Sequence, residues 1–196
     1  MKKNLLISVL MTIVTTILLG IIYPLVVTGL AQVLFKDKAN GQLIVQNGKV
    51  VGSRIIGQSF TGSAYFHSRP SAAGNGYDAA NSSPSNLGPT NQHLIDRVKS
   101  DVATNQLDHP QQAVPVDLIT QSGSGLDPHI SPAAAEFQVD RVAKERGMSA
   151  DDLRPLVLKH TEGRQLGFLG EARVNVLELN LELDQRFPLK KQAKAE

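Results

Sequence analysis

The sequence predicts an α+β protein: one N-terminal transmembrane helix followed by a single small soluble α+β domain. Residues 4–35 contain no charged side chain, which is typical of a membrane span. Beyond them, strand patterns come first, helical patterns follow and a strand pattern ends the chain, without a repeated βαβ unit. The predicted parts are an anchor (1–35), a linker (36–42), the soluble domain (43–187) and a frayed tail (188–196).

The anchor prediction depends on length. Residues 5–30 are mostly Leu, Ile and Val, and a helix of that length extends roughly 39 Å, against about 30 Å of bilayer hydrocarbon. The alternative is a cleaved signal peptide, because residues 29–31 fit a small-x-small cleavage site. The apolar core of a signal peptide is only about 7–15 residues, so a retained anchor is expected.

Three residues in the span are candidates for contact with other membrane helices: Gly20, Pro24 and Gly29. Glycines let helices approach closely, and the proline removes a backbone donor and predicts a kink. Ordinary membrane-helix composition explains them equally well, since Gly and Pro are common in such helices.

Charge suggests an orientation and excludes one class of partner. Two lysines and the α-amino group precede the span, whereas two lysines with an aspartate between them follow it. This small difference places the N terminus in the cytoplasm and residues 36–196 outside it. Beyond residue 35, 18 basic residues (20 − 2) balance 18 acidic ones, so nucleic acid is not an expected partner. The chain has no cysteine, which excludes disulfides and thiolate metal sites.

The soluble part shows recognisable local signals. Asn47-Gly48 lies between two apolar runs and predicts a type I′ hairpin. A helix is predicted over 90–106 with Thr90 as its N-cap, and residues 114–120 are ambiguous between strand and helix. Two more helices are predicted, one beginning at Ser131-Pro132 and ending at Gly147, the next capped by Ser149 and kinked or restarted at Pro155.

The last pattern is an alternation. Leucines at positions 177, 179, 181 and 183 are separated by Glu178, Asn180 and Glu182. A period of two predicts a half-buried strand.

Residues 61–91 form a long segment rich in Gly, Ser, Asn and Pro. A loop of this length is either functional or disordered. Its aromatic and basic residues are unlike a flexible linker, so we interpret the segment as an ordered loop that faces a partner through Tyr65, Phe66, Arg69 and Tyr77.

The sequence does not match common catalytic motifs. The sequence has no nucleophile elbow and no phosphate-binding P-loop, and its five histidines lack metal-ligand spacing. Asp117 and Asp127 form an acid pair only if the fold brings them together. The turn Ser122, Gly123, Ser124, Gly125 before the Ser131 helix is either an anion-binding turn or a structural one, and no lysine stands in it.

Several segments, in order, resemble the C subunit of the Kdp-type potassium-transporting ATPase. They are GIIYPLVVTGLAQ, GSRIIGQSFTGSAYFHSRPSA, SNLGPTN, SGSGLDPHISPAAAEFQVDRVA and TEGRQLGFLGEARVNVLELN. The resemblance implies a non-catalytic, single-pass subunit of the bacterial inner (cell) membrane. The absence of an Asp-Lys-Thr-Gly-Thr phosphorylation motif agrees with an accessory role. The implied partners are a potassium-binding channel-like subunit, an ATP-hydrolysing P-type subunit, a small single-helix subunit and membrane lipid.

The resemblance also implies a catalytic chaperone, which raises the ATP affinity of the hydrolytic subunit and stabilises the complex. ATP would be bound jointly with that subunit, with Gln138 as the nucleotide contact beside residues 122–125. Potassium would be carried by the complex and not bound here. This role conflicts with an extracytoplasmic domain, because nucleotide is cytoplasmic. Either the charge rule misleads, or the effect is indirect, or the chain is a tethered extracytoplasmic binding module that caps the potassium entrance or binds a small ligand.

Overall fold

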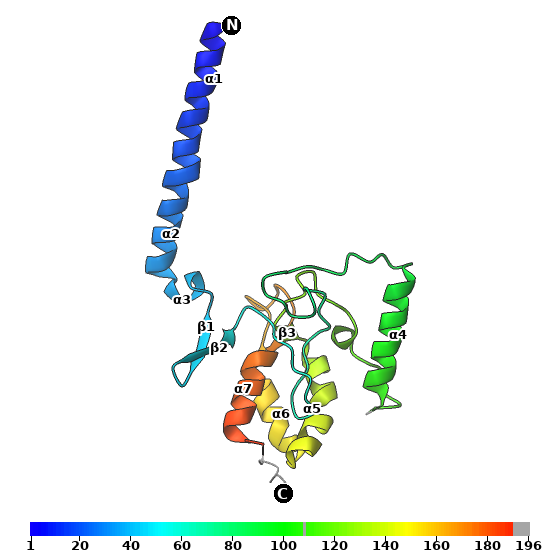
Figure 1. Ribbon diagram of the computed structural model, residues 1–196. Coiled ribbons are helices and arrows are strands. Elements are labelled where there is room, and N and C mark those ends of the chain that lie inside the picture. Colours follow the sequence, from blue (N-terminus) through cyan, green and yellow to red (C-terminus); the bar gives the residue numbers. More distant parts are fainter. Residues whose placement is uncertain (108, 190–196) are drawn as a thin grey trace, which may run out of the picture. The chain divides into compact units, whose positions relative to one another are not determined.

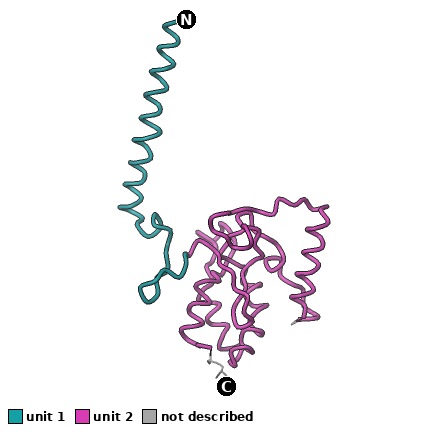
Figure 2. The backbone as a smooth tube through the Cα atoms, viewed as in Figure 1, with its two compact units in different colours: residues 1–53 teal, residues 54–196 magenta. Residues whose placement is uncertain are grey.

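The computed structural model of the chain describes residues 1–107 and 109–189. It divides into two compact units, residues 1–53 and 54–196 (Figure 2). The predicted domain boundaries at residues 35, 42 and 187 remain predictions. Most of the predicted tail, 190–196, lies outside the described residues.

The first unit begins with one continuous helix, Lys2–Leu34, whose length and apolar composition suffice to cross a membrane. It consists of α1 (Lys2–Thr15), a π-helical segment (Thr16–Ile22) and α2 (Tyr23–Leu34) (Figure 1). Pro24 cannot donate to the carbonyl of Gly20, and the π-helical segment that contains Gly20 takes up this irregularity.

A hairpin completes the first unit. The short helix α3 (Lys36–Ala39) precedes the antiparallel strands β1 (Leu43–Gln46) and β2 (Lys49–Ser53). Asn47 and Gly48 have φ values of 51° and 74°, as a type I′ turn requires. The predicted hairpin is therefore confirmed.

The second unit is α+β, as predicted. Its small antiparallel sheet has the order β3-β5-β4, with His129 opposite Asn175 and Thr161 opposite Val174. Residues 114–120, which the sequence left ambiguous, contain a 3₁₀ turn, Val116–Leu118. The elements in order are α4 (Gln92–Gln106), β3 (His129–Ile130), α5 (Pro132–Arg146), α6 (Ala150–Lys159), β4 (Thr161–Glu162), β5 (Arg173–Asn175) and α7 (Val176–Arg186).

Local capping rules place most helix ends. The Ser131 hydroxyl accepts a hydrogen bond from the Ala134 N–H at 3.2 Å, Pro132 opens α5 and Gly147 ends it at φ 66°. Ser149 caps α6 as predicted. One prediction is wrong: Asn91, not Thr90, caps α4. Helix α6 runs on through Pro155, so the restart does not occur, and the alternative, a kink, stays a prediction.

The core lies between helices α5, α6 and α7 and the three-stranded sheet, which the ribbon shows grouped together (Figure 1). One residue from the long irregular segment, Phe66, joins this core. The core residues are Phe66, Leu118, Ile130, Ala134, Ala135, Phe137, Val139, Val142, Ala143, Leu153, Leu156, Val157, Val174, Val176, Leu179 and Leu183.

The predicted C-terminal strand is wrong, because residues 176–186 form helix α7. The same stretch of sequence also fits one face of a helix. Val176, Leu179, Asn180 and Leu183 lie at positions i, i+3, i+4 and i+7, and all four are buried. Leu and Glu favour a helix, and no β-branched residue follows Val176. The Asn175 side chain caps the helix, accepting from the Glu178 N–H at 3.1 Å.

A pair of substitutions tests this helix. Leu179 is fully buried, whereas Leu181 is only partly buried, although a strand would place both on one face. We expect Leu179→Ala to lower the free energy of unfolding by ~2–5 kcal/mol because it leaves a cavity. Leu181→Ala should cost less than about 1.5 kcal/mol. Chemical unfolding of the detergent-solubilised chain measures both, and equal losses would contradict the helix.

Candidate functional site

Two buried carboxamides hold the long segment between β2 and α4, in which no helix or strand is formed. Asn180 of α7, 1% exposed, accepts from the Phe66 N–H and donates to the Phe66 carbonyl, both at 2.9 Å. Gln138 of α5, 3% exposed, does the same for His67, at 2.7 and 3.2 Å. Buried backbone groups need such partners, so two side chains replace the strand that the segment lacks.

Gln138, the predicted nucleotide contact, makes two further bonds. Its Nε2 also donates to the Ala134 carbonyl at 3.1 Å, and its Oε1 also accepts from Arg141 Nη2 at 2.8 Å. An amide group has two donors and two acceptor lone pairs. All four are engaged within the domain, which argues against a nucleotide contact at this side chain.

We call the two carboxamides, Gln138 and Asn180, the amide clamp. Two arginines also hold the backbone of the loop. Arg141 donates to the carbonyls of Ser63 and Tyr65, and Arg146 donates to the Ala64 carbonyl at 2.7 Å. The Arg146 side chain is almost wholly buried and pairs with Asp184 at 2.8 Å. A buried charge needs such a partner.

The four residues predicted to meet a partner are themselves tied to the domain. The expectation that Phe66 faces a partner is corrected, because its side chain is fully buried in the core. The Tyr65 hydroxyl donates to Asp184 at 3.1 Å, beneath the Arg146 guanidinium. Arg69 donates to the Thr120 carbonyl at 3.3 Å, and the Tyr77 hydroxyl donates to the Arg69 carbonyl.

Both tyrosines stay protonated. Burial raises the pKa of Tyr77 to about 12, because desolvation disfavours the phenolate. Burial also raises the pKa of Tyr65, and the hydrogen bond to Asp184 raises it further. Neither phenol is therefore suited to be a base near neutral pH.

The serine and glycine turn holds the loop. The Ser124 carbonyl accepts from the Ser83 N–H and from the Ser82 hydroxyl, both at 3.0 Å. Gly125 has φ 67°, and a Cβ there would lie 2.7 Å from the Ala73 nitrogen, so only glycine fits this close approach. The contacts favour the structural interpretation of residues 122–125.

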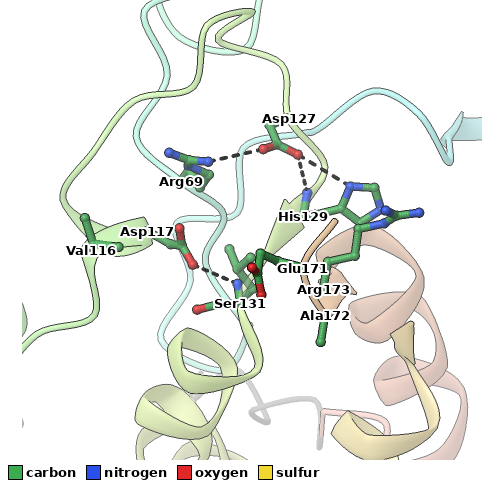
Figure 3. Close-up of a pocket in the computed structure, with 10 residues that line it drawn as sticks. Arg69, Val116, Asp117, Asp127, His129, Ser131, Glu171, Ala172 and Arg173 are labelled. Atoms are coloured by element: carbon green, nitrogen blue, oxygen red, sulfur yellow. Dashed lines mark hydrogen bonds and ion pairs between the residues drawn. The ribbon is translucent and has the colours of Figure 1, made fainter. Parts of the chain in front are cut away.

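A carboxylate of the same domain, that of Asp117, lies at the start of helix α5. Asp117 Oδ2 accepts from the Ser131 N–H at 2.8 Å (Figure 3). Helix N-termini attract negative charge through their free N–H groups and the helix dipole. The side chain of Asp117 supplies that charge from within the domain.

A charged cavity of about 470 Å³ lies beside this helix start (Figure 3). The residues that line it come from the loop, the 3₁₀ turn, β3 and the approach to β5. They are Arg69, Val116, Asp117, Asp127, His129, Ile130, Ser131, Glu171, Ala172 and Arg173. The fold thus brings Asp117 and Asp127 to one cavity, each with partners of its own.

Asp127 is the best-supported carboxylate in the cavity. It accepts from the His129 N–H at 3.0 Å and pairs with Arg69 Nη1 at 3.3 Å (Figure 3). Burial raises the pKa of Asp127, but the hydrogen bonds from His129 and the positive charges of His129 and Arg69 outweigh it, so the pKa lies below its usual value. The side chain is an ionised structural group and not a proton donor.

The lining of the cavity is polar and charged. Acidic and basic side chains line it, among them Arg69, Glu171 and Arg173. Among the described residues, no group of three or more His, Asp or Glu side chains could hold a metal ion. The cavity therefore suits a polar or charged group of a ligand or a partner.

Asn180, Arg146 and Asp184 were missed by the sequence analysis. Asn180 was predicted to lie on the polar face of a strand, and its partner Phe66 is 114 residues away in the sequence. One local signal was available: Asn175 followed three positions later by Glu178 resembles a helix-start pattern. It would have predicted α7 and with it the inward direction of Asn180.

The fold and the site define a class: a small α+β domain on one helix of membrane-spanning length, with its polar side chains used for holding a loop and lining a cavity. The chain belongs to the KdpC family, described as K+-transporting ATPase, c chain, whose family model matches residues 5–185. It is therefore an accessory subunit of an ATPase complex, which implies partner subunits, and no catalytic activity is indicated for it.

Relatives cover nearly the whole chain. The potassium-transporting ATPase KdpC subunit of Koribacter versatilis is 70% identical over 189 residues, which is 96% of this chain and 98% of that protein. The subunit of the same name from Rhodospirillum rubrum is 58% identical over 176 residues, covering 89% and 91% of the two chains. That from Rhodopseudomonas palustris BisB5 is 53% identical, covering 94% and 98%.

The amide clamp makes a sharp prediction. In Asn180→Asp a carboxylate replaces the amide that donates to the Phe66 carbonyl, so two oxygens would face each other in a buried position. We expect a loss of ~2–4 kcal/mol in the free energy of unfolding and faster proteolysis within residues 61–91. Asn86→Asp is the matched control, because Asn86 is exposed and sits at φ 54°, which aspartate tolerates. Equal stability of the two variants would refute the clamp.

Proposed function

We propose that the chain is the single-span accessory subunit of a potassium-importing ATPase and that it holds its second unit on the extracytoplasmic side of the membrane. The observation that carries the proposal is the match to the c-chain family over residues 5–185. The apolar helix Lys2–Leu34 supports anchoring, and the slight excess of positive charge before it supports this orientation.

The partners would be the three that the resemblance implies. A potassium-binding channel-like subunit and a small single-helix subunit would meet the apolar helix, where Gly20 and Gly29 allow close approach and Pro24 removes a backbone donor. The ATP-hydrolysing P-type subunit supplies the energy for transport. The charged cavity would accept a polar loop of one of these proteins, since acidic and basic side chains line it.

The effect on ATP would be indirect. Two observations support this. All four hydrogen-bonding positions of the Gln138 amide are used inside the domain, and the turn 122–125 is bonded to the loop through the Ser124 carbonyl. The subunit would raise ATP affinity by stabilising the assembled complex, and ATP would be bound by the hydrolytic subunit.

A second function rests on the cavity alone. A tethered extracytoplasmic module could cap the potassium entrance or take up a small polar ligand in the 470 Å³ cavity. Both functions place the second unit outside the cytoplasm. They differ in whether the chain requires large membrane partners.

Cysteine labelling tests the orientation. The chain has no cysteine, so Ser124→Cys, at an exposed position of the turn, gives one labelling site. We expect a membrane-impermeant maleimide to label it in intact spheroplasts, while Asn4→Cys, at the N-terminal end of the apolar helix, is labelled only after lysis. The reverse pattern would place the second unit in the cytoplasm and revive direct nucleotide contact.

Co-purification tests the function. An affinity-tagged chain, extracted in mild detergent from cells that also express the proposed partner subunits, should bring down the hydrolytic and channel-like subunits. Replacement of the helix Lys2–Leu34 by an unrelated membrane span should reduce their recovery at equal expression, because the helix faces would be lost. Full recovery of the chain without either large subunit would exclude the accessory role and favour the ligand-binding module.

A further inference from the structure

The connection between β4 and β5 is a tight hairpin whose tip is apolar and exposed. The N–H of Gln165 donates to the Leu169 carbonyl, and the Leu169 N–H donates to the Gln165 carbonyl, both at 2.9 Å. Leu166 and Gly167 have φ values of 53° and 82°, as in a type I′ turn. The side chains of Leu166, Phe168 and Leu169 are 83%, 69% and 47% exposed.

Local propensity does not explain this sequence. A non-glycine residue at positive φ is unfavourable, and Asn or Asp is the usual choice there. Leu166 occupies that position while its side chain is among the most exposed apolar groups of the second unit. Clustered apolar residues at an exposed site indicate a contact surface. The turn therefore keeps an exposed leucine at a position where the backbone conformation favours Gly, Asn or Asp.

We propose that this tip, residues 165–169, inserts into the interfacial layer of the bilayer that holds the chain's own N-terminal helix. The inference rests on the proposed membrane anchoring. Three side chains expose at most a few hundred Å², whereas a specific protein interface buries about 800 Å² per partner. Insertion of Leu and Phe at a lipid interface has no such threshold, because each buried group contributes by itself.

The backbone of the tip is prepared for a nonpolar environment. An unpaired N–H group in lipid costs several kcal/mol. Here the N–H groups of Gly167 and Phe168 donate to the carbonyls of Arg164 and Gln165, both at 3.2 Å, in addition to the two bonds of the bridge. The cost of desolvating the turn is reduced accordingly.

The charges around the tip suit the same placement. Residues 165–170 carry no ionisable side chain. At the base of the hairpin, Arg164 pairs with Glu171 at 2.7 Å. Apolar residues at the end and a compensated ion pair at the base correspond to the acyl boundary and the headgroup layer.

The tether makes weak insertion sufficient. Residues 35–53 separate the apolar helix from the second unit, and because α3 and the β1–β2 hairpin fold most of this segment, its reach is shorter than the roughly 65 Å of a fully extended chain. The tip therefore samples the membrane surface at an effective concentration on the order of millimolar.

A single tryptophan reports on this contact. The chain contains no Trp, so Phe168→Trp adds the only one. The full chain is reconstituted in vesicles of phosphatidylethanolamine and phosphatidylglycerol. We expect blue-shifted emission, quenching by brominated acyl chains and about threefold lower quenching by acrylamide than for an exposed Trp. Leu107→Trp, at the exposed end of α4, is the control.

Each outcome has a defined meaning. Adding Leu166→Asn, which suits positive φ, to Phe168→Trp should keep the fold and weaken quenching by brominated lipid. Equal acrylamide quenching of the Phe168→Trp and Leu107→Trp variants would overturn the inference and leave the proposed function intact. Shielding of the tryptophan in Phe168→Trp only in the presence of the partner subunits would also overturn it, in favour of a protein contact. Release of the unmodified chain from vesicles at high pH would overturn the anchoring itself.

Discussion

The second unit depends on two carboxamides that each pair with one buried peptide. Gln138 and Asn180 stand on different helices, and they bind the backbone of adjacent residues, His67 and Phe66. A buried segment without strand partners would leave its polar groups unsatisfied at a cost of about 1–3 kcal/mol each. The two amides remove that cost and let Phe66 complete the core between the helices.

The cavity follows from the same constraint. Once Phe66 and His67 are fixed, Arg69 lies two residues further along the chain and reaches Asp127, which His129 also supports. The turn at 122–125 then receives the next part of the loop through Ser71 and Ser83. Polar groups that resemble a site in the sequence are thus mostly engaged with one another. What is left for a partner is the cavity mouth and the outer surface, which fits a subunit that works by association.

Several features that depend on residues close together in the sequence were predicted correctly. The Asn47-Gly48 turn, the Ser131-Pro132 start and the Gly147 end of α5 all depend on residues within a few positions of each other. Helix α7 was misassigned because its leucines fit both periods, and the local signal that favours a helix, Asn175 followed by Glu178, was not used. The functions of Gln138 and Asn180 could not be predicted, since their partners lie 71 and 114 residues away. The long apolar span was predictable because a bilayer imposes its length directly.

Asp117 gives the beginning of α5 a property that the sequence motif conceals. Its carboxylate accepts the N–H of the N-cap residue Ser131, beside the helix end whose dipole attracts negative charge. An intramolecular counter-charge is present at a fixed stoichiometry, whatever the surrounding medium contains. The helix end therefore depends less on the phosphate, sulfate or chloride content of the surrounding solution.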